Sequence, residues 1–136
     1  MASTVMERMT QRPEYRVKRV YDEAEEGDGR RVLVDRLWPR GVSKESAHID
    51  EWAKEVTPSN DLRKWYHAAP QTRRAEFERR YRSELAADDA REGLSRLRTA
   101  AAAGPLTLIT ATKDPEHSHV PVLLEELGET PGGDRR

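Results

Sequence analysis

The apolar positions of the chain form two strand-like runs separated by a long stretch of helical periodicity. Val32 to Val34 make a short apolar run, and Leu106 to Ala111 make a longer one that is rich in β-branched residues. Continuous apolar runs of this length are typical of strands covered on both faces of a sheet. Tyr15 to Tyr21 alternates between apolar and polar residues instead, which predicts a half-exposed strand.

The sequence between the two runs predicts the helices. Four apolar residues spaced at i, i+3, i+4 and i+7 predict one face of a short helix that Pro58 ends. They are Ile49, Trp52, Ala53 and Val56. Ser59 is typical of the N-cap of the next helix, and Pro121 of the first turn of the last one. Three successive helices are predicted between Ser59 and Gly104, each with its own buried residues. These are Leu62, Trp65 and Tyr66 in the first, Phe77, Tyr81 and Leu85 in the second, and Leu94, Leu97 and Ala101 in the third.

The connections between the strands predict an α/β fold. The linker from Asp22 to Arg30 is too short for a helical crossover, so the first two strands should pair antiparallel or not be neighbours. About seventy residues separate the second strand from the last, which favours parallel pairing of these two strands. We therefore predict a small single-domain sheet with at least one parallel strand pair, flanked by several helices and spanning residues 14–128. Residues 1–13 and 129–136 are expected to be flexible tails.

Composition narrows the class of protein. Charged residues make up 36% of the chain and apolar residues 35%, and the net charge is −1, so the overall field does not favour nucleic acid or a membrane as partner. The absence of cysteine excludes disulfides, thiol nucleophiles and thiolate metal sites. Without a long apolar segment or a signal-peptide core, the expected location is the cytoplasm, with no membrane partner. The oligomeric state stays open.

The segment Arg31 to Gly41, with the sequence RVLVDRLWPRG, carries the strongest sign of a site. Asp35 and Arg36 directly follow an apolar strand, and a stiff Trp-Pro turn then carries Arg40. Arginine matches phosphate and carboxylate oxygens bidentately, and strand ends are where α/β proteins place ligands. The alternative is an internal Asp–Arg ion pair that ties the loop to the sheet.

A second candidate cluster follows the last strand. If the second and last strands are parallel, Lys113 and Asp114 emerge beside Asp35 and Arg36. His117 and His119 could share a divalent cation with Asp114, although this spacing of two histidines is a nonspecific motif. The alternative is that one histidine caps the last helix or lies on the surface. No other cofactor is indicated.

The segment from Arg73 to Arg82 contains five arginines and could contact nucleic acid. Glutamates interleave with them and place Glu76–Arg80 and Glu78–Arg82 at i, i+4 spacing. A solvated face whose charges pair with one another is the favoured interpretation, so nucleic-acid binding is not the expected function.

Several segments in this order resemble the YeaO-like bacterial family, a domain-of-unknown-function family. They read VKRVYD, RVLVDRLWPRG, EWAKEVTPSNDLRKWYH, FERRYRSEL and LTLITATKD, followed by His119. The resemblance runs from Val17 to Leu127 and implies a small cytosolic α/β domain without an established reaction. Thr110 stands where the family usually has tyrosine, and Ser118 where it has asparagine. The polar residues that match the family pattern are Asp35, Arg36, Arg40, Lys54, Ser59, Arg63, Lys113, Asp114 and His119.

Two functions follow as hypotheses. In the first, Arg36, Arg40 and Lys113 hold a small anion that bears a phosphate or a carboxylate, with Lys54, Ser59 and Arg63 as further ligand-binding residues implied by the resemblance. Asp35 or Asp114 would act as a base or metal ligand and His119 as a proton carrier. The alternative is a regulatory or nucleic-acid-associated binding module that uses the face from Arg73 to Arg82 and performs no chemistry.

Overall fold

A four-stranded sheet and five α-helices make up the computed structural model, which describes residues 15–128. The predicted flexible tails lie outside the described residues. The strands are Tyr15–Arg19 (β1), Arg30–Leu33 (β2), Glu51–Trp52 (β3) and Leu106–Thr110 (β4). The α-helices are Lys44–Ala47 (α2), Asn60–Ala68 (α3), Pro70–Leu85 (α4), Asp88–Ala103 (α5) and Val120–Leu127 (α6). Three 3-10 turns are Glu26–Asp28 (η1), Lys54–Val56 (η2) and Pro115–His117 (η3).

All four strands are parallel, in the order β1-β4-β2-β3. β4 is central and fully buried, and its Leu108 pairs with Val17 of β1 on one side and Val32 of β2 on the other. The predicted parallel pairing of the second and last strands is confirmed. β1 and β2 are not neighbours, because β4 lies between them, which is one of the two arrangements predicted from the short linker.

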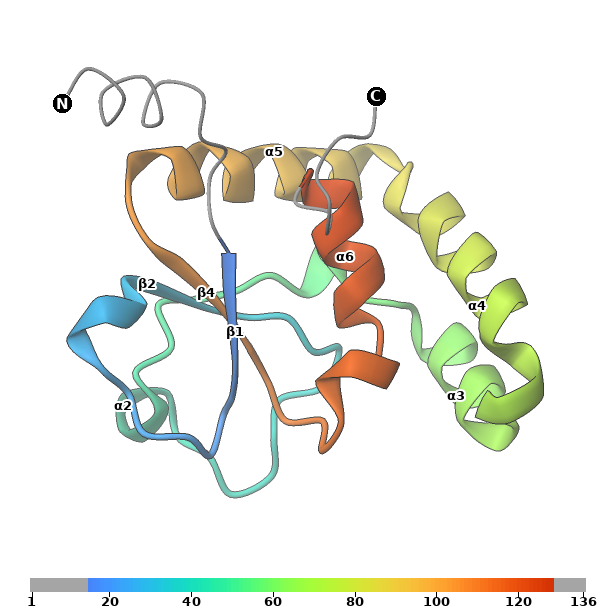
Figure 1. Ribbon diagram of the computed structural model, residues 1–136, viewed down its shortest axis with the longest axis horizontal. Coiled ribbons are helices and arrows are strands. Elements are labelled where there is room, and N and C mark those ends of the chain that lie inside the picture. The colour runs from blue at the N-terminus through green and yellow to red at the C-terminus, as the bar shows by residue number, and fades with distance from the viewer. Residues whose placement is uncertain (1–14, 129–136) are drawn as a thin grey trace, which may run out of the picture.

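The alternating side chains of the central strands build two cores of unequal size. Val32 and Leu108 point into the larger core, which is completed by buried residues of α3, α4, α5 and α6. Leu33 and Ile109 point to the opposite face, where α2 and its flanking loops cover them. Figure 1 shows α2 set apart from the other four helices, on the far side of the strands. Covering both faces explains why these strands read as continuous apolar runs.

The helix predicted over Ile49 to Val56 is wrong. This segment instead forms β3, which pairs with β2, and the turn η2. Ile49 packs into the smaller core, whereas Ala53 and Val56 pack into the larger one, so residues at helical spacing serve two faces of the sheet. Ion pairs anchor this edge strand, because Glu51 binds Arg30 of β2 at 2.9 Å and Arg96 of α5 at 2.6 Å.

The other helices follow their sequence signals. The hydroxyl of Ser59 caps α3 by accepting a hydrogen bond from Leu62 N at 3.2 Å. Pro70 and Pro121 lie in the first turns of α4 and α6. None of the helices within residues 15–128 has the length and apolar character needed to cross a membrane. With every strand parallel, the loops that follow β2 and β4 leave the sheet at the same edge.

Candidate functional site

Asp35 joins the ends of β2 and β4. One carboxylate oxygen accepts from the Thr110 hydroxyl at 2.7 Å, and the other accepts from Ala111 N at 2.8 Å. The predicted meeting of these two loops is therefore confirmed, through neutral donors of β4 rather than through an Asp–Arg ion pair. Thr110 is fully buried and supplies the hydroxyl of this contact.

The Trp-Pro turn is fixed from both sides. Trp38 Nε1 donates to the carbonyl of Val42 at 2.6 Å, and the ring of Trp38 meets that of Trp52 edge to face with centroids 5.3 Å apart. Gly41 follows with a φ of 76°, which favours glycine. Arg40, held on this rigid turn, is exposed and makes no hydrogen bond or ion pair with any described residue.

Arg36 has a different environment from Arg40. Its Nε donates to the carbonyl of Pro58 and its Nη2 to the carbonyl of Thr57, both at 3.0 Å. These bonds hold the loop before α3 against the loop after β2. Two of the five guanidinium N–H groups are thus used within the protein, and Arg36 is partly a structural tie.

A cleft of about 670 Å³ opens between the loops after β2 and β4 and the helices α3 and α4. Three predicted arginines line it, together with Asp35, Asp114 and His119. Aromatic and proline side chains supply much of the remaining wall. The lining includes the arginines Arg36, Arg40 and Arg63 and the aromatic residues Trp38, Tyr66 and Phe77.

Arg63, which lines this cleft, has an unsatisfied donor. Its Nε is buried and has no hydrogen-bond partner among the described residues. Its other side-chain contact is a long bond from Nη2 to Asn60 Oδ1, at 3.4 Å. Buried guanidinium N–H groups are normally paired, so an unpaired one on a cleft wall is informative.

Tyr66 lies on the α3 side of the cleft, and Arg74 of α4 holds it in place. The Tyr66 ring stacks on Phe77 with centroids 4.1 Å apart. Arg74 Nη1 donates to the Tyr66 hydroxyl at 3.0 Å and to the carbonyls of His117 and Ser118. Sequence analysis missed the contribution of both residues, since Arg74 is one of five arginines in its segment and Tyr66 reads only as a buried helix residue.

His119 is anchored beside the end of β2. Its Nε2 lies 2.6 Å from the carbonyl of Val34, which can only accept, so Nε2 carries a proton. Lost hydration lowers the pKa of His119, against opposing effects of the Val34 carbonyl and the Asp35 charge. Nδ1 bonds no residue in the described part of the chain, and His119 is one of the residues that line the cleft.

The predicted metal ligands do not converge. Asp114 and His117 form a pair at 2.6 Å, but their side chains are 61% and 80% exposed, while His119 is turned toward Val34. Within the described residues, no group of three or more histidine and acidic side chains is arranged to hold a metal ion. The hydroxyl of Ser118 accepts a hydrogen bond from Val120 N at 3.1 Å at the start of α6.

Three other predicted ligand-binding residues lie apart from the cleft lining. Lys113 is exposed beyond β4, and Lys54 rests over the ring of Trp52 at 5.1 Å. Ser59 caps α3 and also donates its hydroxyl to Glu84 at 2.6 Å, so its hydrogen bonds are structural.

The arginines of α4 are engaged within the protein. Arg74 pairs with Glu78 at 2.7 Å and Arg80 with Glu76 at 2.6 Å. Arg79 also pairs with Glu76. The remaining contacts are those of Arg82 with Glu78, Glu125 and Glu126, and of Arg73 with the carbonyl of Trp65. This geometry supports the interpretation of a self-paired face.

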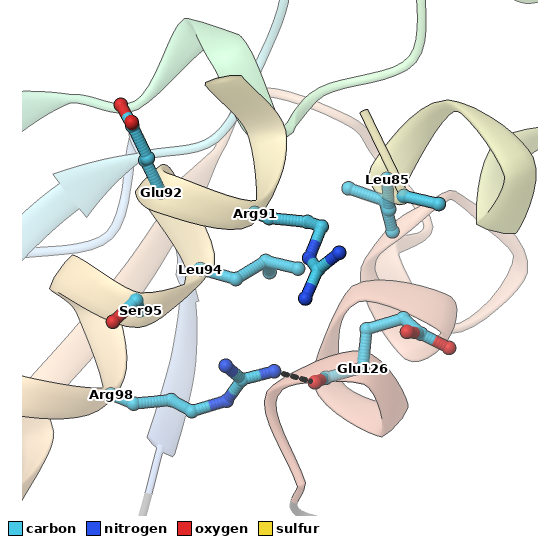
Figure 2. Close-up of a pocket in the computed structure, with 8 residues that line it drawn as sticks. Leu85, Arg91, Glu92, Leu94, Ser95, Arg98 and Glu126 are labelled. Atoms are coloured by element: carbon cyan, nitrogen blue, oxygen red, sulfur yellow. Dashed lines mark hydrogen bonds between the residues drawn. The ribbon is translucent and has the colours of Figure 1, made fainter. Parts of the chain in front are cut away.

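A second hollow, of about 570 Å³, lies between the end of α4, α5 and α6. Figure 2 shows Arg91 and Arg98 reaching from α5 toward α6, where Arg98 donates to the carbonyl of Glu126 at 2.6 Å. This bond satisfies a carbonyl in the last turn of α6. Arg91 is exposed and makes no side-chain hydrogen bond within residues 15–128. It is therefore comparable to Arg40 in exposure and in the lack of a partner.

Comparisons with known proteins place the chain in a family. A family described as the inactive DUF488-N3 subclade matches residues 14–132. The chain is 47% identical over 110 residues to the uncharacterized protein YeaO of Escherichia coli K12, covering 81% of this chain and 93% of that protein. The chain belongs to this YeaO-like family.

The resemblance seen in the sequence is thereby confirmed. Another YeaO-like relative is the uncharacterized protein Mb3100c of Mycobacterium bovis, 41% identical over 119 residues, which are 88% of this chain and 98% of the relative. A protein of Mycobacterium tuberculosis, Rv3073c, matches to the same extent. No solved structure matches significantly. The YeaO-like family is bacterial and its function is unknown.

Proposed function

We propose that this YeaO-like protein binds a small anion, bearing a phosphate or a carboxylate, in the cleft at the carboxyl edge of the sheet. The observation that carries the proposal is that two arginines lining the cleft have unused donors, the exposed guanidinium of Arg40 and the buried Nε of Arg63. Three arginines and two aspartates line the cleft, and arginine is well suited to oxygen anions. A cytoplasmic location stays a prediction from the sequence.

Binding without chemistry is the form of the proposal that the geometry favours. Asp35 uses both carboxylate oxygens on β4, and Asp114 is paired with His117 at the surface. Asp114 and His119 also line the cleft, but each is bonded to another part of the protein, and a general base must lie within hydrogen-bond reach of the proton that it abstracts. The description of the family as inactive supports the same conclusion.

Replacing Arg40 with glutamine tests the proposal. We expect Arg40→Gln to weaken anion binding about tenfold, because a charge-assisted hydrogen bond contributes roughly 1.5–3 kcal/mol. Its melting temperature without ligand should stay that of the wild type, since exposed residues without partners contribute within about 0.5 kcal/mol. A thermal-shift screen would first select ligands. Calorimetry would then measure the binding of inorganic phosphate, simple phosphate monoesters and simple carboxylic acids.

Arg91→Gln is the matched control. It removes one exposed, unpartnered arginine from the other hollow and should leave anion binding unchanged. The proposal fails if no anion in the screen binds, or if Arg91→Gln weakens binding as much as Arg40→Gln. Salt-dependent binding of nucleic acid that is lost in Arg79→Ala would instead favour the binding module on α4.

A further inference from the structure

We infer that the ligand is an acid that carries a flat, apolar ring, and that Arg63 receives its acid group. This inference rests on the proposed anion-binding function and adds the class of ligand to it. Two features of the cleft lead to it, the chemistry of the walls and the unpaired donor of Arg63.

The walls of the cleft suit a ring better than a small polar anion. Trp38 and the stacked, largely buried pair of Tyr66 and Phe77 are among the lining residues, and three prolines add apolar surface. These prolines are Pro39, Pro58 and Pro70. Pockets for small organic molecules are mostly apolar, with a few placed polar groups, and have volumes of about 300–1,000 Å³. The cleft matches both properties, whereas phosphate or acetate alone would leave its apolar surface in water.

The aromatic wall is held in place without a ligand. Tyr66 is buried, stacks on Phe77, and is fixed through its hydroxyl by Arg74. On the opposite side, Trp38 is fixed by its bond to the Val42 carbonyl and by its contact with Trp52. A ring entering the cleft would therefore meet prearranged surfaces, which reduces the entropy lost on binding.

Arg63 differs from the other arginines of the cleft because it has one buried donor without a partner among the described residues. Arg36 directs Nε and Nη2 to backbone carbonyls, and Arg40 keeps its guanidinium in solvent. The buried Nε of Arg63 has no acceptor among residues 15–128, and such a group lowers the stability of the fold until an acceptor arrives. A carboxylate or phosphate oxygen is the acceptor that guanidinium groups bind most strongly.

The experiment compares each ring-bearing acid with its two halves by titration calorimetry. Adenosine monophosphate is set against ribose 5-phosphate and adenosine, and indole-3-acetate against acetate and indole. We expect at least one ring-bearing acid to bind about tenfold or more tightly than either of its halves. The two sets separate a nucleotide source of the ligand from an aromatic carboxylic acid.

Arg63→Met tests the receptor. Methionine replaces the unbranched apolar stem of arginine but lacks the unpaired donor. We therefore expect binding of the ring-bearing acid to fall about tenfold. The melting temperature should stay that of the wild type or rise. Arg91→Met, at an exposed arginine outside the cleft, should change neither quantity. A lowered melting temperature in Arg63→Met would identify Arg63 as a structural residue and overturn its role as receptor.

The outcomes separate this inference from the function on which it rests. Equal binding of the ring-bearing acids and their ring-free halves would overturn the ring while leaving anion binding intact. Binding of adenosine or indole as tightly as the matching acid, with no loss in Arg63→Met, would overturn the role of Arg63. If no acid in either set and no inorganic phosphate binds, the proposed function itself is wrong.

Discussion

Asp28→Ala will lower the free energy of unfolding by about 3 kcal/mol, because it leaves buried cations without their counterion. The Asp28 side chain is fully buried and binds Arg31 at 2.6 Å and Lys18 at 3.1 Å. Arg31 is itself 4% exposed, so water cannot replace the lost carboxylate. Urea unfolding followed by circular dichroism measures the change. Glu92→Ala, which removes an exposed carboxylate from α5, should cost less than about 0.5 kcal/mol.

The stabilising effect of Asp28 will also depend on pH. Burial by itself raises the pKa of Asp28, but hydrogen bonds from Glu25 N, Lys18 and Arg31 outweigh it and hold the pKa below its ordinary value of 3.8. A depressed carboxyl pKa contributes stability that is present above the ordinary pKa and is lost as the pH falls through the folded-state pKa. The stability difference between wild type and Asp28→Asn should therefore shrink as the pH falls from about 6 to about 2. A constant difference over that range would contradict the assigned charge state.

The fold could be predicted from the sequence wherever the pattern of apolar residues in a segment matched the burial of a single helix or strand. The central strand β4 contacts helices on one side and α2 with its loops on the other, and its uninterrupted apolar run reflects this burial. The segment from Ile49 to Val56 broke the rule, since its apolar residues divide between two cores. A two-residue edge strand such as β3 also leaves no alternation to detect.

The site could be predicted as far as the sheet determines it. Parallel strands bring the ends of β2 and β4 together, and this placed Asp35 and Arg36 beside the loop after Thr110. The far wall could not be predicted, because it depends on how α3 and α4 pack. Tyr66 and Arg74 have ordinary helical positions in the sequence, and only the packed structure shows that Tyr66 lines the cleft and that both residues contact the loop at His117.

Asp35→Ala will lower the free energy of unfolding by about 2–3 kcal/mol. This result would distinguish the structural residues of the segment Arg31 to Gly41 from those available to a ligand. The substitution removes the acceptors of the Thr110 hydroxyl and of Ala111 N and leaves both donors unpaired at the end of β4. Asp35→Asn should cost less, because a rotated amide can accept from Ala111 N and donate to Thr110. Chemical denaturation of both variants gives these values.

Asp114→Ala provides the comparison on the neighbouring loop. Its carboxylate is 61% exposed and binds only His117 in the described structure, so its loss should cost less than about 0.5 kcal/mol. Asp35→Ala with wild-type stability would show that the carboxylate is not a tie between the strands. It would then be free to act on a ligand, and the catalytic role predicted for Asp35 would regain support. A loss of the expected size instead assigns Asp35 to the frame of the cleft and leaves anion recognition to Arg40, which has no partner among the described residues, and to Arg63, whose Nε has none.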